Sequence, residues 1–315
     1  MRLNKIRLPK DKSLRSEVFC LHDDYWKNNT DKISNVTSSH WKFWSEKTVL
    51  TADQTSDFVN FRGAGFGDFR NKMFAPLFAI SPVNYFLTQM MKPLPKTFIN
   101  ALYEVCLEHN REVSFDCVKQ VLSVNRIIES EVNFSGKRVC VIGDGYGFLG
   151  CFIKKIFPNV NIVSINLGKI LFFDFLLSVQ KNENSTFNYV SSENNYDDCA
   201  DFNFVPAEII FKTGIDDIDI FFNIASMQEM NIETVNQYFS FIRAQSRRKK
   251  YFYCCNRLSK TLPAGNIIKF DDYDWKDSDK ILFDELCEWY QIYPKNRPPF
   301  RGRFDGRIWH KFIEI

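Results

Sequence analysis

The sequence predicts an α/β protein with a doubly wound sheet, preceded by a mainly helical N-terminal segment. From Lys137 onward, short apolar runs alternate with amphipathic stretches, which is typical of parallel strands joined by crossover helices. A cluster of glycines follows the first of these apolar runs. Before residue 130, apolar residues instead recur at helical spacing. We therefore expect an accessory or cap segment at residues 1–130 and an α/β domain at residues 131–315.

The N-terminal segment is expected to contain two amphipathic helices. One is indicated by Phe98, Leu102, Val105 and Cys106, and the other by apolar residues between positions 118 and 128. The glycine-containing stretch at residues 62–72 mixes hinge-like glycines with polar and aromatic side chains. It is a candidate for a lid or acceptor pocket, and a purely structural or dimerising cap is the alternative.

Six apolar runs in the α/β domain are expected to be strands, and four stretches between them are expected to be helices. The expected strands are residues 139–142, 160–165, 204–211, 218–225, 251–255 and 307–315. The expected helices are residues 148–156, ended by Pro158, then residues 168–180, a third helix capped by Asn231, and a fourth around residues 281–289. Residues 168–180 are almost wholly apolar, so that helix is expected to be buried on most sides.

The amino-acid composition limits which classes of binding partner we expect. Among 315 residues, 41 are Lys or Arg and 38 are Asp or Glu, so the formal net charge of +3 does not favour nucleic acid. The chain has neither a signal-peptide core nor an apolar run of membrane-spanning length, and we expect a cytoplasmic protein. Its nine cysteines form no C-x-x-C pair, so no metal is predicted. A homo-oligomer is compatible with the sequence.

The turn after the first strand is expected to bind a ligand. Gly143, Gly145 and Gly147 lie where a strand ends and a helix begins, so backbone N–H groups there can approach a cofactor closely. Gly143-x-Gly145-x-Gly147 fits an S-adenosylmethionine (SAM) loop, whereas Gly145-x-Gly147-x-x-Gly150 also satisfies a dinucleotide fingerprint. Both cofactors usually meet an acidic residue at the end of the second strand, a position that Asn166 occupies.

Three stretches resemble class I SAM-dependent methyltransferases, and among them the bacterial sugar O-methyltransferases. They are VIGDGYG at 141–147, DIFFNIASMQEM at 219–230, and the tail from FYCCNRL at 252–258 to WHKFIEI. The resemblance covers about residues 120–315. It implies a Rossmann-like sheet of seven strands, SAM bound across the strand carboxyl ends, and methyl transfer to a sugar hydroxyl.

The resemblance and the glycine turn together define the expected cofactor site. Asp144 is assigned either to a polar group of the cofactor or to N–H groups of its own turn. Asn166 is assigned to a ribose hydroxyl or to the turn alone. The predicted cofactor-binding residues are Gly143, Asp144, Gly145, Tyr146, Gly147, Asn166, Leu167, Ala225 and Ser226.

Catalytic and acceptor-binding candidates lie at the ends of later strands. A sugar hydroxyl is a weak nucleophile, so a base within hydrogen-bond reach is expected to take its proton. Glu229 is the leading candidate, its alternative role being to stabilise the N-terminus of the next helix. His310 is a second catalytic candidate, and a structural histidine is its alternative. Asn256 and Arg257 are expected to bind sugar hydroxyls or an anionic substituent, and a surface or loop-bracing role is the alternative for both.

The sequence thus predicts a SAM-dependent O-methyltransferase acting on a sugar of a surface polysaccharide, lipopolysaccharide or nucleotide-sugar pathway. The overlapping glycine pattern leaves an NAD-dependent oxidoreductase as one alternative. A non-catalytic scaffold with a SAM-binding fold is the other, because Val141 and Asn166 stand where such enzymes often carry acidic residues.

Overall fold

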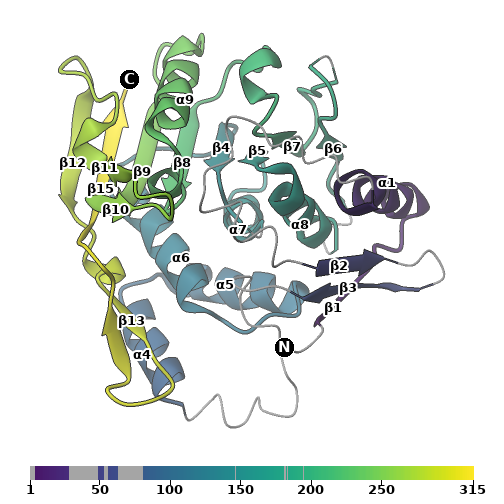
Figure 1. Ribbon diagram of the computed structural model, residues 1–315, viewed down its shortest axis with the longest axis horizontal. Helices are drawn as coiled ribbons and strands as arrows, with labels where there is room; N and C mark the ends of the chain where they lie inside the picture. The colour runs from purple at the N-terminus through teal and green to yellow at the C-terminus, as the bar shows by residue number, and fades with distance from the viewer. Residues whose placement is uncertain are drawn as a thin grey trace.

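A computed structural model describes residues 4–27, 49–52, 56–62, 81–145, 147–180, 182, 184–193 and 195–315 of the chain. A large mixed sheet runs through the middle of this part, with helices on both faces (Figure 1). A smaller N-terminal sheet lies beside one end of it, next to α1 and α8.

Within the described residues the large sheet has eight strands in the order β12-β15-β9-β8-β4-β5-β7-β6. All neighbouring strands pair in parallel except β15, which runs antiparallel to β9 and β12. The first strand, β4, lies in the centre, the chain winds outward through β5 on one side, and it returns through β8 on the other. The eight strands are β4 (Arg138–Ile142), β5 (Asn161–Asn166), β6 (Phe187–Tyr189), β7 (Phe202–Pro206), β8 (Ile220–Ile224), β9 (Tyr251–Arg257), β12 (Lys280–Leu286) and β15 (Ile308–Glu314).

The doubly wound α/β prediction is confirmed, and the predicted number of seven strands is wrong. The additional strand, β6, is a short edge strand paired with β7. The helix expected around residues 281–289 is also wrong, because residues 280–286 form β12 at the opposite edge of the sheet. Antiparallel pairing with β15 satisfies its backbone, and a bulge between Ile281 and Phe283 breaks the alternation that would have revealed a strand.

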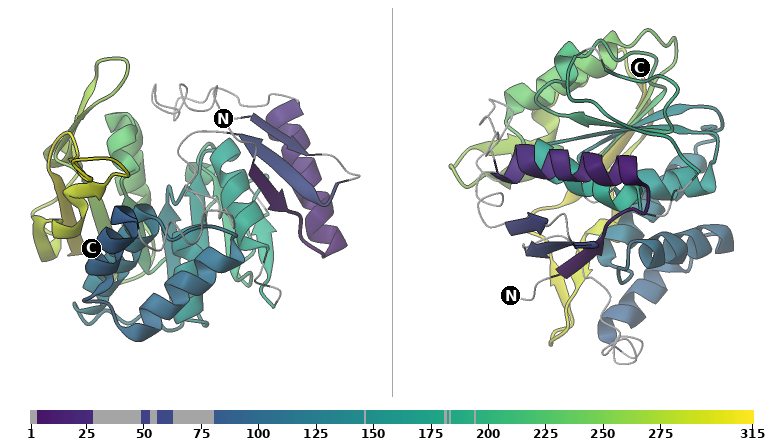
Figure 2. Two further views of the ribbon diagram at one scale, coloured as in Figure 1. Left: turned by 90° about the horizontal axis from the view of Figure 1, so that it is seen from below. Right: turned by 90° about the vertical axis from the view of Figure 1, so that its right-hand side faces the viewer.

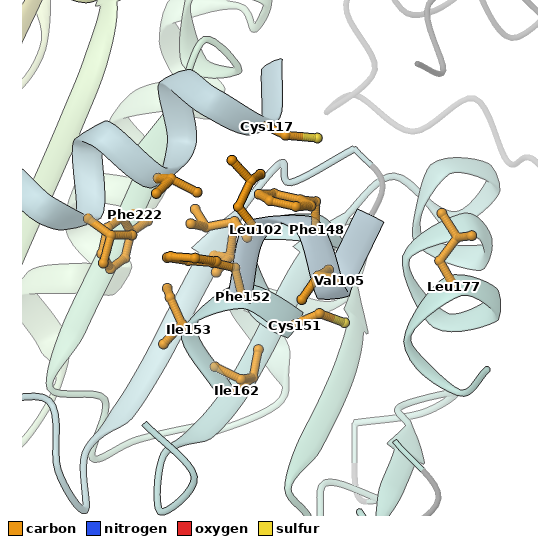
Figure 3. Close-up of a cluster of buried hydrophobic side chains, with 14 of the residues drawn as sticks. Leu102, Val105, Cys117, Phe148, Cys151, Phe152, Ile153, Ile162, Leu177 and Phe222 are labelled. Atoms are coloured by element: carbon orange, nitrogen blue, oxygen red, sulfur yellow. The ribbon is translucent and has the colours of Figure 1, made fainter. Parts of the chain in front are cut away.

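Each face of the sheet packs on its own hydrophobic core. Along β4, Val139 and Val141 belong to one core, whereas Cys140 and Ile142 belong to the other, as the period of two in a strand requires. The first core lies under α5, α6, α7 and α8, and the second lies under α9 (Figures 1 and 3). The helices are α5 (Lys96–Glu108), α6 (Phe115–Ile128), α7 (Phe148–Ile156), α8 (Gly168–Ser178) and α9 (Ile232–Ala244).

Several predicted helices have the expected bounds and burial. In α8, ten of eleven residues are buried, as its almost wholly apolar sequence predicted. Helix α7 begins directly after Gly147 and ends just before Pro158. Asn231 holds the N-cap position of α9 without donating or accepting a side-chain capping bond.

The N-terminal part is less helical than predicted in the residues that the structure describes. Besides helices it contains a three-stranded antiparallel sheet in the order β1-β3-β2, which lies beside α1 and α8 (Figures 1 and 2). Helices α5 and α6 pack on α7, so one core continues across residue 130 (Figure 3). The domain boundary there stays a prediction. The N-terminal elements are β1 (Asn4–Arg7), α1 (Lys12–His22), the π-helical turn η1 (Asp23–Lys27), β2 (Val49–Ala52), β3 (Phe58–Arg62) and α4 (Pro82–Met91).

Two hairpins extend from the edge of the sheet where the parallel strands end. Strand β9 ends at Arg257, opposite the first residue of β15, Ile308. The segments that follow β9 and precede β15 therefore emerge at this carboxyl edge. They form β10 (Ser259–Thr261) with β11 (Ile267–Lys269), and β13 (Ile292–Pro294) with β14 (Arg301–Arg303).

Candidate functional site

The carboxyl ends of β4, β5 and β8 surround a hollow whose empty space, open solvent included, is about 340 Å³. In doubly wound sheets, ligands bind outside the strand carboxyl ends where the winding reverses, which here is between β4 and β8. Four of the predicted cofactor-binding residues lie in its wall, together with side chains from the end of β5, the segment after β7, the turn after β8 and α9. The lining residues are Gly143, Ile165, Asn166, Leu167, Ala207, Ser226, Met230, Thr234 and Tyr238.

The glycines after β4 have distinct roles in shaping this site. All three adopt positive φ angles, 76° at Gly143, 81° at Gly145 and 63° at Gly147. A Cβ atom at Gly143 would lie 2.0 Å from Oγ of Ser226, so β4 and β8 approach this closely only with glycine there. At Gly147 it would lie 2.7 Å from the backbone oxygen of Asp174, whereas at Gly145 it would meet no atom of the described residues within 4 Å. Gly145 is therefore the glycine that leaves room for a ligand beside the loop.

Asp144 caps the helix that follows the loop. Its carboxylate oxygens accept hydrogen bonds from the backbone N–H groups of Leu149, at 3.1 Å, and Gly150, at 3.0 Å. Burial raises the pKa of Asp144 to about 6, even though these N–H groups favour its charged form. Asp144 was predicted to bind either a polar group of the cofactor or nearby backbone N–H groups. The structure shows the contact with backbone N–H groups.

Asn166 is joined to a buried carboxyl group that the sequence analysis did not single out. Its side-chain N–H donates to Oδ2 of Asp174 at 3.0 Å, and its Oδ1 accepts from the Leu167 N–H at 3.0 Å. Asp174 is fully buried in α8, and burial raises its pKa well above the usual range. Its other oxygen, Oδ1, has no hydrogen-bond partner among the described residues. Asn166 thus presents its remaining donor and acceptor capacity to the hollow from a fixed orientation.

A buried amide network holds the turn after β8. Asn223 donates to the backbone oxygen of Ile142 at 3.0 Å, and its Oδ1 accepts from Asn256 at 2.9 Å and from the Met227 N–H at 3.1 Å. Oδ1 of Asn256 accepts in turn from the Gln228 N–H at 3.0 Å. Asn256 is fully buried, so its amide positions this turn rather than facing an acceptor.

Two predicted cofactor-binding residues and the predicted base stand on this turn. Ala225 adopts a φ of 63°, unusual for a residue with a side chain, and this bend brings Ser226 against Gly143. Glu229 ends the short 3-10 turn Met227–Glu229 and accepts a hydrogen bond from Nζ of Lys260 at 2.7 Å. The pair is mostly shielded from water, with side-chain exposures of 16% and 12%. Lys260, on β10, thereby fixes the Glu229 carboxylate at the carboxyl edge.

His310 lies away from these residues. It is buried in an aromatic cluster, where its Nδ1 is 3.1 Å from the hydroxyl of Tyr253 and its ring packs against Phe283 and Trp289. Burial lowers its pKa to about 4. The structure does not bring it together with Glu229, and its contacts are those of the alternative, a structural histidine.

Arg257 stays at the carboxyl edge, directly after the last buried residue of β9. Its backbone N–H donates to Oε1 of Gln228 at 2.8 Å, and its guanidinium lies 5.6 Å from the ring centre of Phe304. Its Nε is buried and has no hydrogen-bond partner among the described residues. The remaining predicted site residue, Tyr146, lies outside the described residues, as does nearly all of the candidate lid at residues 62–72.

Sequence reasoning missed Asp174 and Lys260. Asp174 is the one charged residue within an apolar helix after Lys169, a signal that a buried carboxyl group needs a reason to be there. No pattern in the sequence around Lys260 indicates its role, because its contact with Glu229 forms only when β10 packs on the turn after β8. Across the described residues, no group of His, Cys, Asp and Glu is arranged to hold a metal ion. In the same part of the chain, no helix has the length and apolar character required to cross a membrane.

Neither a protein-family model nor a curated protein matches this chain. Among solved structures, it is similar to a SAM-dependent methyltransferase from Aquifex aeolicus, with 10% identity, 61% of this chain and 88% of that chain covered, and a TM-score of 0.35. It is also similar to coclaurine N-methyltransferase, with 12% identity, 54% and 51% covered, and a TM-score of 0.38. A third similar structure is the mitomycin 7-O-methyltransferase MmcR, with 13% identity and a TM-score of 0.34. The match covers 84% of this chain and 79% of that chain. The match thus spans about half the length of coclaurine N-methyltransferase.

Proposed function

We propose that this protein is a SAM-dependent O-methyltransferase that acts on a sugar hydroxyl. The observation that carries the proposal is the hollow at the reversal of the sheet, where an open glycine loop faces the ends of β5 and β8. Its wall combines apolar side chains suited to an adenine ring with Asn166, which can bind a ribose hydroxyl. The sugar as acceptor is supported by the sequence resemblance alone.

The residues present fit this cofactor. Gly145 leaves space beside the loop, Asn166 retains hydrogen-bonding capacity, and Ser226 lies against the loop from the other side. When bound, SAM supplies an electrophilic methyl group on a sulfonium centre. Methyl transfer is an in-line displacement, so the protein mainly aligns the acceptor oxygen and keeps water out.

Glu229 is proposed to accept the hydroxyl proton at its carboxylate. It stands one turn beyond Ser226, on the side of the hollow toward β9 and β10. The contact with Lys260 fixes its position, and the Asn223–Asn256 network holds the backbone of the same turn. Arg257 is proposed to bind the acceptor from the neighbouring strand end.

Calorimetric titration with S-adenosylhomocysteine and, separately, with NAD⁺ tests the cofactor. We expect saturable binding of the first alone. Binding of NAD⁺ alone would replace the proposal with an oxidoreductase, and binding of neither would favour a non-catalytic scaffold.

Glu229→Gln tests the base. We expect turnover to fall at least tenfold with S-adenosylhomocysteine affinity nearly unchanged, because the substitution removes the proton acceptor and leaves the glycine loop intact. Glu233→Gln is the matched control, since Glu233 is an exposed carboxylate in the first turn of α9. Equal turnover in both variants would remove Glu229 from the mechanism.

A further inference from the structure

The segment between β12 and β15, residues 287–307, is strongly basic. It contains five basic residues and two acidic ones, an excess of three, which equals the formal net charge of the whole 315-residue chain. The remainder of the chain is balanced as a whole, although residues 234–270 are more basic still, with eight Lys or Arg residues and no Asp or Glu. The basic residues are Lys295, Arg297, Arg301, Arg303 and Arg307.

These cations have no ion pair among the described residues, and neither does Arg257. Three arginines elsewhere do have carboxylate partners, although Arg7 and Arg248 have none among the described residues. Arg126 pairs with Glu285 at 2.9 Å, Arg138 with Asp198 at 3.0 Å, and Arg243 with Asp279 at 2.7 Å. Exposed cations without an ion pair inside the protein are available to an external anion.

The segment lies at the carboxyl edge of the sheet, where the proposed acceptor binds. Strand β12 ends opposite Trp309 and β15 begins opposite Arg257, so everything between them is held at this edge. Figure 2 shows the hairpin beside α4, on the side of the sheet occupied by β9 and β15.

Aromatic rings position two of the guanidinium groups. Arg257 lies 5.6 Å from the ring centre of Phe304, and Arg301 lies 5.5 Å from that of Phe86. Both rings contact Phe115, at 6.1 and 6.4 Å between ring centres. The two cations thus stand over one continuous aromatic surface, and the buried Nε of Arg257 has no hydrogen-bond partner among the described residues.

We infer that the acceptor carries a phosphate ester, and that Arg257 and the β13–β14 hairpin bind it. A planar guanidinium donates two parallel hydrogen bonds to phosphate oxygens, and several of them suit an anion with more than one charge. This inference rests on the proposed function. A sugar phosphate and a nucleoside diphosphate sugar share the required chemistry.

The test is calorimetric titration of the full chain with inorganic pyrophosphate, glucose 1-phosphate, UDP-glucose and methyl α-glucoside. We expect the phosphate-bearing probes to bind, with affinity falling between 50 and 200 mM salt, and the uncharged glucoside not to bind. Tighter binding of UDP-glucose than of glucose 1-phosphate would assign the nucleotide sugar, and the reverse order would assign the sugar phosphate.

Arg301→Ala/Arg303→Ala is expected to weaken binding of the phosphate-bearing probes at least tenfold, because each charge-assisted contact is lost. Arg248→Ala/Lys249→Ala is the matched control. It removes two exposed charges that precede β9, at the amino ends of the parallel strands. The affinity for the phosphate-bearing probes should stay unchanged.

Three results with the small-molecule probes and the variants would overturn the inference. These are absence of binding by every phosphate-bearing probe at millimolar concentration, equal binding of the uncharged glucoside, and equal losses in the two double variants. Binding confined to polyuridylate or to anionic lipid vesicles would also overturn it, in favour of a macromolecular partner. S-adenosylhomocysteine binding, measured on the same samples, reports separately on the proposed function.

Discussion

The reversal point of the sheet and the basic segment at residues 287–307 share one edge of the molecule and are built in opposite ways. At the reversal point, Asn223 and Asn256 bind each other and the surrounding backbone, and Gly143 allows contact with Ser226. In the basic segment, five cations have no ion pair within the described residues. Polar side chains that hydrogen-bond to other protein groups hold the backbone of the site in place. Charged side chains that have no ion pair within the protein are available to a ligand.

Among the variants that test this comparison, Gly143→Ala is expected to lower the free energy of unfolding most. The new Cβ would lie 2.0 Å from Oγ and 2.5 Å from Cβ of Ser226, at a backbone φ of 76°. Overpacking and backbone strain together are expected to cost about 3 kcal/mol of unfolding free energy. Thermal and chemical unfolding would measure this loss.

Gly145→Ala is the matched substitution for Gly143→Ala. Its φ of 81° imposes similar strain, but within the described part of the chain its Cβ would meet nothing closer than 4 Å. We expect a stability loss of about 1 kcal/mol from the backbone alone, together with weakened S-adenosylhomocysteine binding. Equal stability losses in both variants would contradict the assigned roles, as would retained cofactor affinity in Gly145→Ala.

The second effect is a pH dependence of stability that originates at the reversal point. Burial raises the pKa of Asp144 to about 6, from an ordinary value near 3.8. Because the folded protein then binds this proton more tightly than the unfolded chain, the contribution is fully present below pH 4 and is lost as the pH rises through 6. The shift of about two units corresponds to about 3 kcal/mol at most, since each unit is worth about 1.4 kcal/mol.

Asp144→Asn is expected to remove this pH dependence. The free energy of unfolding, measured by denaturant titration between pH 4 and pH 7.5, should fall less steeply with rising pH in the variant than in the parent protein. Asp277→Asn, at an exposed loop position, should keep the parent slope. Parallel curves for the parent protein and Asp144→Asn would show that the buried carboxyl group is not linked to folding in this range.

The sequence predicted the reversal point better than the basic edge. The positions of β4, β5, β8 and β9 follow from apolar runs, and the loop at residues 143–147 follows from glycine spacing, because both signals are local. Strand β12 was predicted as a helix, since its bulge and its pairing with β15 depend on residues far along the chain. The contact of Glu229 with Lys260 and the stacking of Arg301 on Phe86 likewise join distant segments, and no local pattern reports such contacts.

The smallest effect, and the sharpest test of the comparison, is expected for Arg303→Ala. Arg303 is exposed and has no ion pair among the described residues, so the free energy of unfolding should change by less than about 0.5 kcal/mol. Arg243→Ala is the contrasting control, because Arg243 donates to both carboxylate oxygens of Asp279, at 2.7 and 2.8 Å, and Asp279 is buried. Leaving that carboxylate without its partner should cost about 2 kcal/mol or more. Denaturant unfolding of both variants measures the difference. If Arg303→Ala lowered the free energy of unfolding as much as Arg243→Ala, the basic segment would stabilise the fold. Its cations would then have a structural role rather than a role in binding a ligand.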